Sequence, residues 1–115
     1  MRHIVSLKQN REFRRLYAKG RQAVSPCQVV YCRKNGRDCN RLGITVSTKL
    51  GGAVVRNRVR RRFREIYRLN LNRLCTGYDL VIVARSRAVG ADYALLEADF
   101  LRLCGKLGLL AGGSI

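Results

Sequence analysis

The sequence predicts an α/β (α+β) two-layer sandwich, in which helices pack on one small central sheet. Three observations predict this class. Segments with helical apolar spacing alternate with β-rich segments, an arginine-rich segment keeps one apolar stripe, and one short segment is apolar almost throughout. The chain has 115 residues, of which 47% are hydrophobic, and this size suits one domain. We expect a single domain over residues 1–115, with an ordered core at about 7–107 and a loose tail from residue 108.

The first predicted helix covers about residues 10–18. Phe13, Leu16 and Tyr17 recur at intervals of three and one, so that all three lie on one face of a helix. Gly20 follows directly, and glycine is a residue type that commonly ends helices. The sequence therefore predicts a short amphipathic helix near the N-terminus.

Two or three strands are predicted next. Residues 28–32 contain β-branched and aromatic side chains, and Asn35 and Gly36 mark a turn after them. Residues 42–47 alternate apolar with small or polar side chains, which predicts a further strand. Gly51-Gly52 then interrupts the pattern.

A long helix is predicted over about residues 53–74. Its apolar residues recur at intervals close to three, four or seven, and at 100° per residue they form one stripe. These residues are Val55, Val59, Phe63, Ile66, Tyr67 and Leu74. Thr76-Gly77 is expected to end the helix.

A strand and a helix complete the order. Residues 78–84 form a nearly continuous apolar run, which predicts a strand in the centre of the sheet. Residues 91–107 show helical periodicity and predict an amphipathic helix. Its inward residues are expected to be Leu95, Leu96, Phe100, Leu103 and Leu107.

The charge balance indicates the class of partner. Lysine and arginine total 24 against 7 acids, a formal charge of +17. A surface with this charge repels itself unless a polyanion neutralises it, and nucleic acid is the commonest polyanion. An anionic membrane is the alternative, but a membrane-binding protein needs a free apolar helix face or a lipidation signal. The sequence shows neither signal.

The most informative segment is the run at residues 56–68, which holds seven arginines and one acid. Asn57, Arg61, Arg64 and Arg68 lie along one side of the predicted helix; Arg58 and Arg62 form a parallel row, and Arg56 and Arg60 lie nearer the core edge. Like charges at these spacings destabilise an isolated helix, and the arginine fork binds two phosphate oxygens at once. We interpret this face as a phosphate-binding surface, because a solvated charged face normally includes more acids.

The aromatic residues leave two alternatives open. If the first helix packs at the edge of the sheet, Phe13, Tyr17 and Tyr31 line a groove of the kind that holds single-stranded RNA. Alternatively, all three residues belong to the hydrophobic core, and this is the interpretation that periodicity alone favours.

The chain resembles the bacterial ribonuclease P protein family over roughly residues 7–107. The strongest match is the run LGITVSTKLGGAVVRNRVRRRFREIY at residues 42–67. It contains a strand ending in V-S-T-K, a G-A-V turn and an R-N-R-V-R-R helix start, in the family's order. The first helix with its F-x-x-x-Y pair and the strand at residues 78–85 extend the resemblance. Tyr17 is a mild departure, because relatives often carry Phe there.

The resemblance implies a fold and two RNA-facing surfaces. The fold is similar to that of a ribosomal-protein domain and has an unusual left-handed β-α-β crossover, whereas general handedness rules favour a right-handed one. The residues implied to contact the catalytic RNA are Arg56, Asn57, Arg58, Arg60, Arg61, Arg64 and Arg68. Those implied to bind the 5′ leader of precursor tRNA are Phe13, Tyr17, Val29, Tyr31, Ser47 and Lys49.

The resemblance also implies that the chain is a subunit of an endonuclease whose RNA carries the chemistry. It implies a 1:1 complex of protein and RNA that acts on precursor tRNA, with Mg²⁺ at the RNA. The residues agree, since they offer no catalytic residue: His3, the one histidine, lies at an end expected to be mobile, and the seven acids are scattered. No metal-ligating set is evident among the protein residues.

Three alternatives of other classes are weighed against this function. A structural RNA-binding protein of ribosomal type accounts for the charge and the fold but not for the combined motif. A stand-alone nuclease needs a carboxylate or histidine cluster, and a membrane-active protein needs the signals described above. The five cysteines contain no C-x-x-C pair, so we expect reduced, partly buried thiols and a cytoplasmic location.

Overall fold

The computed structural model describes residues 4–111, which form five strands and three α-helices. The strands are β1 (Val5–Ser6), β2 (Arg21–Val24), β3 (Gln28–Lys34), β4 (Arg41–Thr45) and β5 (Tyr78–Ala84). The helices are α1 (Asn10–Lys19), α2 (Ala53–Leu69) and α3 (Tyr93–Lys106). Short 3-10 turns lie at Thr48–Leu50, Leu71–Arg73 and Ser86–Ala88.

The strands form one open sheet in the order β1-β4-β5-β3-β2. β4 and β1 are parallel neighbours, as are β4 and β5, whereas β3 is antiparallel to both β5 and β2. β5 therefore lies in the centre of the sheet, which confirms the position predicted from its apolar run. Its side chains at Leu80, Val81 and Ile82 are fully buried, because helices cover it on both faces.

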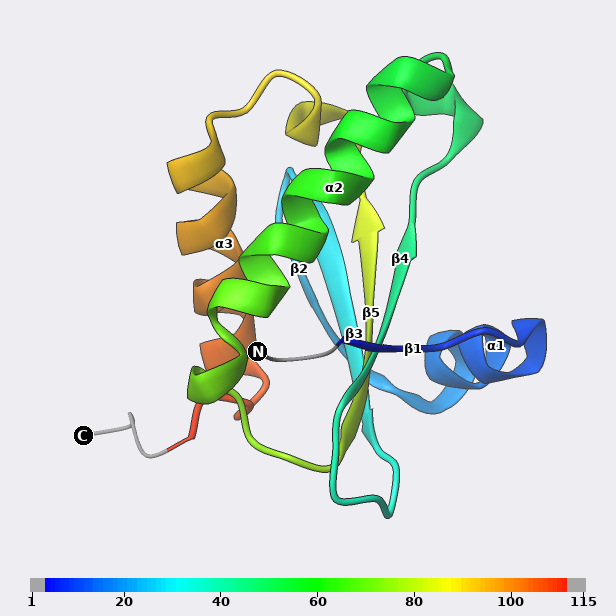
Figure 1. Ribbon diagram of the computed structural model, residues 1–115, viewed down its shortest axis with the longest axis vertical. Helices are drawn as coiled ribbons and strands as arrows, with labels where there is room; N and C mark the ends of the chain where they lie inside the picture. Colours follow the sequence, from blue (N-terminus) through cyan, green and yellow to red (C-terminus); the bar gives the residue numbers. More distant parts are fainter. Residues whose placement is uncertain (1–3, 112–115) are drawn as a thin grey trace.

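The connection from β4 through α2 to β5 is left-handed. Figure 1 shows α2 in front of the sheet, with β4 and β5 both running upward and β5 to the left of β4. A right-handed crossover would place β5 on the other side of β4. The handedness implied by the family resemblance is therefore present, and the general rule gives the wrong hand here.

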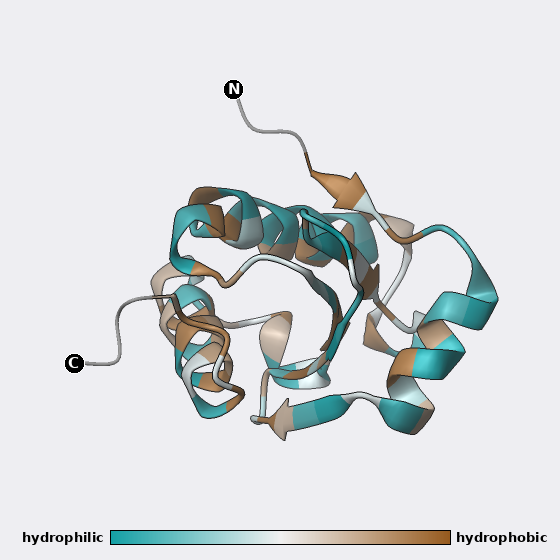
Figure 2. Cartoon of the chain, turned by 90° about the horizontal axis from the view of Figure 1, so that it is seen from below, coloured by the Kyte–Doolittle hydropathy of each residue, from teal (hydrophilic) through white to brown (hydrophobic). Residues whose placement is uncertain are grey.

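The larger core lies between the sheet and a layer formed by α2 and α3. It contains Phe63, Ile66 and Tyr67 from α2, and Leu96 and Phe100 from α3. α1 crosses the opposite face, where Leu16 packs with Leu7 and Val81 in a smaller cluster. In Figure 2, α1 and α2 are largely hydrophilic ribbons interrupted by hydrophobic residues, as expected for helices that bury one side. The sandwich class predicted from the sequence is confirmed.

α2 is shorter than predicted, since it ends at Leu69 and not near residue 74. Asn70 ends it, because its side-chain amide donates to the Ile66 carbonyl at 2.8 Å and to Glu97 Oε2 at 2.8 Å. The Asn70 backbone N–H donates to both the Ile66 and the Tyr67 carbonyls at 3.2 Å, so the last turn tightens before the 3-10 turn at Leu71–Arg73. Leu74 is buried, as expected, but it lies beyond the helix and pairs with Leu110 in an isolated bridge.

Two further expectations about the C-terminal region are wrong. The side chain of Leu95 is 55% exposed, whereas Leu96, Phe100, Leu103 and Leu107 point inward. The tail is also packed as far as Ala111, since Leu109 is buried and its carbonyl accepts from the Cys75 N–H at 2.6 Å. Residues 112–115, and His3 at the other end, lie outside the described residues.

Candidate nucleic-acid interface

The charged face of α2 is presented to solvent. Phe63, Ile66 and Tyr67 turn inward, and the opposite side of the helix carries the exposed set Asn57, Arg58, Arg61, Arg64 and Arg68. Arg56, Arg60 and Arg62 are half-buried along the flanks. We call the exposed set the arginine face. Its position confirms the geometry predicted from spacing, because a buried stripe on one side of a helix forces the other side outward.

Most of the arginine face is not neutralised by the protein itself. Arg68 pairs with Glu65 at 2.7 Å, and this hydrogen-bonded pair lowers the pKa of Glu65 from its ordinary value. Within residues 4–111, Arg58, Arg61 and Arg64 form no ion pair with any carboxylate. Three adjacent guanidinium groups therefore keep their full charge and their hydrogen-bond donors for an external anion.

An aromatic groove lies between α1 and the end of β4. Tyr17 is 40% exposed, and its ring meets that of Tyr31 edge to face with centroids 5.0 Å apart. The Tyr17 hydroxyl shares a hydrogen bond of 2.8 Å with Thr45 Oγ1. Phe13 packs directly over Gly43 of β4. These rings are only partly buried, so the structure favours the groove over the alternative in which they are wholly core residues.

The groove has a volume of about 490 Å³ and extends from α1 to the flank of α2. Its lining residues are Asn10, Phe13, Arg14, Tyr17, Ile44, Thr45, Val46 and Arg60. Arg60 belongs to α2, and Asn57 Oδ1 accepts a hydrogen bond of 2.9 Å from its guanidinium. The family resemblance grouped Arg60 with the other arginines of α2, whereas the structure also places it at the edge of the groove.

The remaining predicted groove residues do not line it. Val29 and Tyr31 point to the α1 side of the sheet, since they alternate along β3 with buried residues that face α2 and α3. Ser47 and Lys49 are exposed beside the entry to α2, and Ser47 Oγ accepts from the Lys49 N–H at 3.2 Å.

Sequence reasoning missed Arg14 and Thr45 as lining residues of the groove. Arg14 offers a weak signal, because it lies three residues before Tyr17 on the predicted helix. Thr45 offers none, because only the packing of α1 over β4 brings it to the Tyr17 hydroxyl.

Gly43 provides a test of the groove wall. A Cβ atom at this position would lie 2.5 Å from Phe13 Cε1 and 2.6 Å from Phe13 Cζ. We expect Gly43→Ala to displace the ring and lower the free energy of unfolding by about 1–2 kcal/mol, as overpacking does, measured by urea unfolding. Phe13→Leu in the same chain is expected to recover most of this loss. Gly90→Ala, which meets no atom within 4 Å, is the control, and equal stability of both alanine variants would contradict the prediction.

Two acidic residues that are distant in sequence both accept hydrogen bonds from Arg41. The Arg41 guanidinium donates to both carboxylate oxygens of Asp79, at 2.9 and 2.8 Å, and to Glu12 Oε2 at 2.7 Å. The hydrogen bonds that Arg41 donates to Asp79 raise the pKa of Arg41 further above its ordinary value. Burial raises the pKa of Glu12, but hydrogen bonds from Gln9 and Arg41 outweigh it and the net pKa is lowered. An arginine thus occupies the space between the two carboxylates.

The cysteines are all free thiols. Burial raises the pKa of Cys27 and of Cys32, and it raises the pKa of Cys104 to about 12. Protonated thiols are poor nucleophiles and poor metal ligands. Across residues 4–111, no group of three histidine, cysteine or acidic side chains is arranged to hold a metal ion. In the same residues, no helix is both long and apolar enough to cross a membrane.

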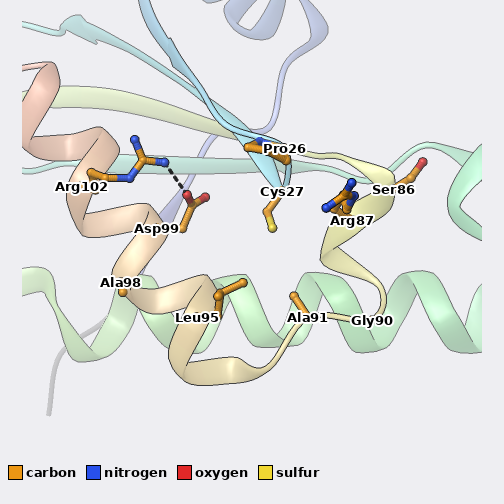
Figure 3. A pocket seen from close by; sticks show the side chains of 10 residues that line it. All are labelled: Pro26, Cys27, Ser86, Arg87, Gly90, Ala91, Leu95, Ala98, Asp99 and Arg102. Carbon is orange, nitrogen blue, oxygen red and sulfur yellow. Dashed lines mark hydrogen bonds and ion pairs between the residues drawn. The ribbon is translucent and has the colours of Figure 1, made fainter.

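A further cavity, with a volume of about 730 Å³, lies elsewhere. Figure 3 shows it between the β2–β3 turn, the 3-10 turn after β5, and α3, with Pro26, Cys27 and Leu95 among its lining residues. Asp99 at its edge pairs with Arg102 at 2.8 Å and accepts from Gln28 Nε2 at 2.9 Å. None of its lining residues belongs to the arginine face or the aromatic groove.

An un-neutralised row of arginines beside a groove with aromatic walls is an arrangement suited to RNA, since phosphates meet the guanidinium groups and unpaired bases stack on rings. The fold and the two surfaces together define a small, basic RNA-binding protein.

The chain belongs to the ribonuclease P protein family, whose model matches residues 1–108. The ribonuclease P protein component of Natranaerobius thermophilus is 42% identical over 110 residues, which are 96% of each chain. That of Clostridium acetobutylicum is 43% identical over 106 residues, or 90% of this chain and 89% of the relative. The role of the chain is therefore that of the protein subunit of a ribonucleoprotein endoribonuclease of tRNA processing, with an RNA subunit as its partner.

Solved structures of the family have the same fold. The Staphylococcus aureus RNase P protein superimposes with a TM-score of 0.85 at 29% identity, over 94% of this chain and 99% of that one. The Thermotoga maritima RNase P protein gives a TM-score of 0.78 at 32% identity, over 88% of this chain and 94% of that one.

Proposed function

We propose that the two surfaces of the subunit bind two different RNAs. The arginine face, with Arg56 and Arg60 at its flanks, binds the catalytic RNA. The aromatic groove, together with Val29, Tyr31, Ser47 and Lys49, holds the single-stranded 5′ leader of precursor tRNA. The complex contains one protein and one RNA, and the protein works in the cytoplasm, where tRNA is processed.

One observation carries this proposal: Arg60 connects the two surfaces. It lines the aromatic groove, and its guanidinium is oriented by Asn57 of the arginine face at 2.9 Å. A substrate strand in the groove would therefore lie beside the catalytic RNA on α2. The intervening positive charge lowers the electrostatic cost of bringing two polyanions together.

The chemistry is assigned to the RNA subunit with bound Mg²⁺. The protein contributes affinity and position, since its carboxylates at Glu12 and Asp79 are held by Arg41 and are not free to bind a metal ion. Glu65 is likewise paired with Arg68. No protein residue is assigned to the bond-breaking step.

Reconstitution tests the proposal. Precursor tRNA is incubated at near-physiological magnesium with the protein, with a bacterial ribonuclease P RNA, or with both. We expect cleavage at the mature 5′ end to rise sharply only when both are present. Cleavage by the protein alone would reveal an active site in the protein, and RNA binding without stimulation would favour a structural role of the ribosomal type.

Alanine at Phe13 or Tyr31 should weaken substrate binding selectively. Loss of a ring that stacks on a base costs about 1–3 kcal/mol, so we expect the holoenzyme to bind precursor tRNA about 10-fold more weakly. Binding of mature tRNA, which has no leader, should change less than about two-fold. Equilibrium binding of both ligands to the same preparation measures the difference, and equal losses would refute the assignment of the groove to the leader.

A further inference from the structure

A second polar pocket lies on the other flank of α1, at the opposite end of the sheet from the aromatic groove. Its volume is about 440 Å³. Six cations line it, from α1, β3, the β3–β4 turn and β4: Arg11, Arg15, Arg33, Lys34, Arg37 and Arg41. We call it the α1–β3 basic pocket. The acids in its lining are Glu12 and Asp79, so the pocket carries a formal charge of +4.

The two acids do not neutralise the other five cations. Both carboxylates are engaged by Arg41, at 2.7 Å from Glu12 and 2.8 Å from Asp79. In the part of the chain that the structure describes, Arg11, Arg15, Arg33, Lys34 and Arg37 have no carboxylate within ion-pair distance. Five like charges around one concavity repel one another, and a bound anion relieves that repulsion.

The frame of the pocket is fixed by hydrogen bonds. The Asn35 side-chain amide donates to the Cys39 carbonyl at 3.1 Å and to Asp79 Oδ1 at 2.9 Å, and its Oδ1 accepts from the Arg37 N–H at 2.8 Å. The Asn35 N–H also bonds to the Gly77 carbonyl at 2.9 Å. Arg41 of β4 also links α1 and β5, through its ion pairs with Glu12 and Asp79. A ligand therefore meets walls that are already ordered, which reduces the entropic cost of binding.

The pocket is separate from both surfaces described above. Arg41 is the first residue of β4, whereas Thr45, at the aromatic groove, is the last. Four residue steps along a strand span about 13 Å, and α1 lies between the two sites. α1 thus presents Phe13 and Tyr17 to one side, and Arg11 and Arg15 to the other.

We propose that the α1–β3 basic pocket is a third RNA-binding site, which takes phosphate groups of an RNA backbone. Arginine dominates its lining, and the guanidinium fork matches two oxygens of a phosphodiester. The phosphates come from the RNA subunit or from the body of the tRNA substrate. The proposal rests on the RNA partnership of the family and not on the assignment of the leader to the aromatic groove.

The test compares two charge-matched double variants. Arg15→Ala/Arg37→Ala removes two exposed cations from the pocket, and Arg73→Ala/Lys106→Ala removes two exposed cations that do not line it. In the first arm, the affinity of each protein for the RNA subunit is measured as a function of KCl concentration. In the second arm, preformed holoenzyme at saturating protein is titrated with precursor and with mature tRNA.

We expect the pocket variant to bind RNA about 10-fold more weakly, or weaker still, in one arm. The slope of its log affinity against log KCl concentration should become shallower by about one to two, because fewer counterions are released. The control variant should change less than about two-fold. A loss in the first arm assigns the phosphates to the RNA subunit, and an equal loss for both tRNAs in the second arm assigns them to the tRNA body. Identical behaviour of the two double variants in both arms would overturn the proposal.

Two further measurements distinguish loss of the pocket from loss of stability and from failure of the proposed function. Thermal melting must show the same stability for the pocket variant as for the wild type, and Arg15→Gln/Arg37→Gln repeats the test with larger side chains if the alanine variant is less stable. Arg61→Ala/Arg64→Ala is run in parallel. If this α2 variant loses affinity and the pocket variant does not, the proposed role of the pocket is refuted while the proposed function stands.

Discussion

Arg61→Ala/Arg64→Ala is expected to weaken binding of the RNA subunit by about 100-fold at physiological salt. Each hydrogen-bonded contact between a guanidinium and a phosphate contributes on the order of 1.5 kcal/mol, and the two residues are adjacent on the exposed face of α2. The slope of log affinity against log salt concentration should become shallower by about two, because about one counterion fewer is released for each lost contact. Titration of the RNA subunit at several KCl concentrations measures both quantities.

The stability of this variant is expected to be unchanged. Neither arginine pairs with a carboxylate in residues 4–111, and neither side chain is buried. Removing like charges from one helix face can even stabilise the free protein slightly. Arg73→Ala/Lys106→Ala removes the same charge from another surface, so it shows how much of the loss is due to net charge alone. Equal losses for the two variants would show that α2 makes no specific contact.

Arg41→Met is expected to lower the free energy of unfolding by about 2–3 kcal/mol at neutral pH. The side chains of Arg41, Glu12 and Asp79 are 16%, 21% and 13% exposed. Removal of the guanidinium therefore leaves two carboxylates in a largely desolvated place without a cationic partner. Breaking a fully buried pair costs about 3–5 kcal/mol, and the residual exposure here reduces that figure. Urea unfolding of the wild type and the variant measures the difference.

The pH dependence of this loss has a definite sign. The pKa of Glu12 in the folded protein is lowered from 4.5, so its contribution is complete above that value and is lost as pH falls through the lowered pKa. The stability difference between wild type and Arg41→Met should therefore narrow below about pH 4.5. Glu12→Gln/Asp79→Asn in the Arg41→Met background should recover part of the loss, because it removes the unpaired charges. A difference below about 0.5 kcal/mol at pH 7 would contradict the role of Arg41.

The elements that could be predicted from sequence are those that depend on local periodicity. The buried stripe at Val59, Phe63 and Ile66 places the arginines on the other side of α2 whatever the helix packs against. The apolar run of β5 likewise requires cover on both faces, and hence a central position. These patterns repeat within a few residues, so no long-range contact is needed to interpret them.

Where prediction failed, a distant contact decided the outcome. α2 ends at Leu69, where the Asn70 side chain bonds to Glu97 of α3, and helical spacing cannot reveal that contact. Leu95 and Leu96 are equally apolar, and the packing of α3 on the sheet buries only Leu96. The tail is ordered as far as Ala111 because the Ala111 N–H donates to the Arg73 carbonyl at 2.7 Å, and composition alone does not show this bond.

By itself, the sequence determined that the chain is a basic α/β domain with one arginine-covered helix, because composition and local periodicity fix charge and amphipathic faces. Only the tertiary structure decided that Arg60 lies at the aromatic groove, that Tyr17 meets Thr45, and that Arg41 gathers Glu12 and Asp79. The Tyr17–Thr45, Glu12–Arg41 and Arg41–Asp79 contacts join residues 28, 29 and 38 positions apart. They depend on strand order and on the hand of the crossover, which local sequence patterns do not encode.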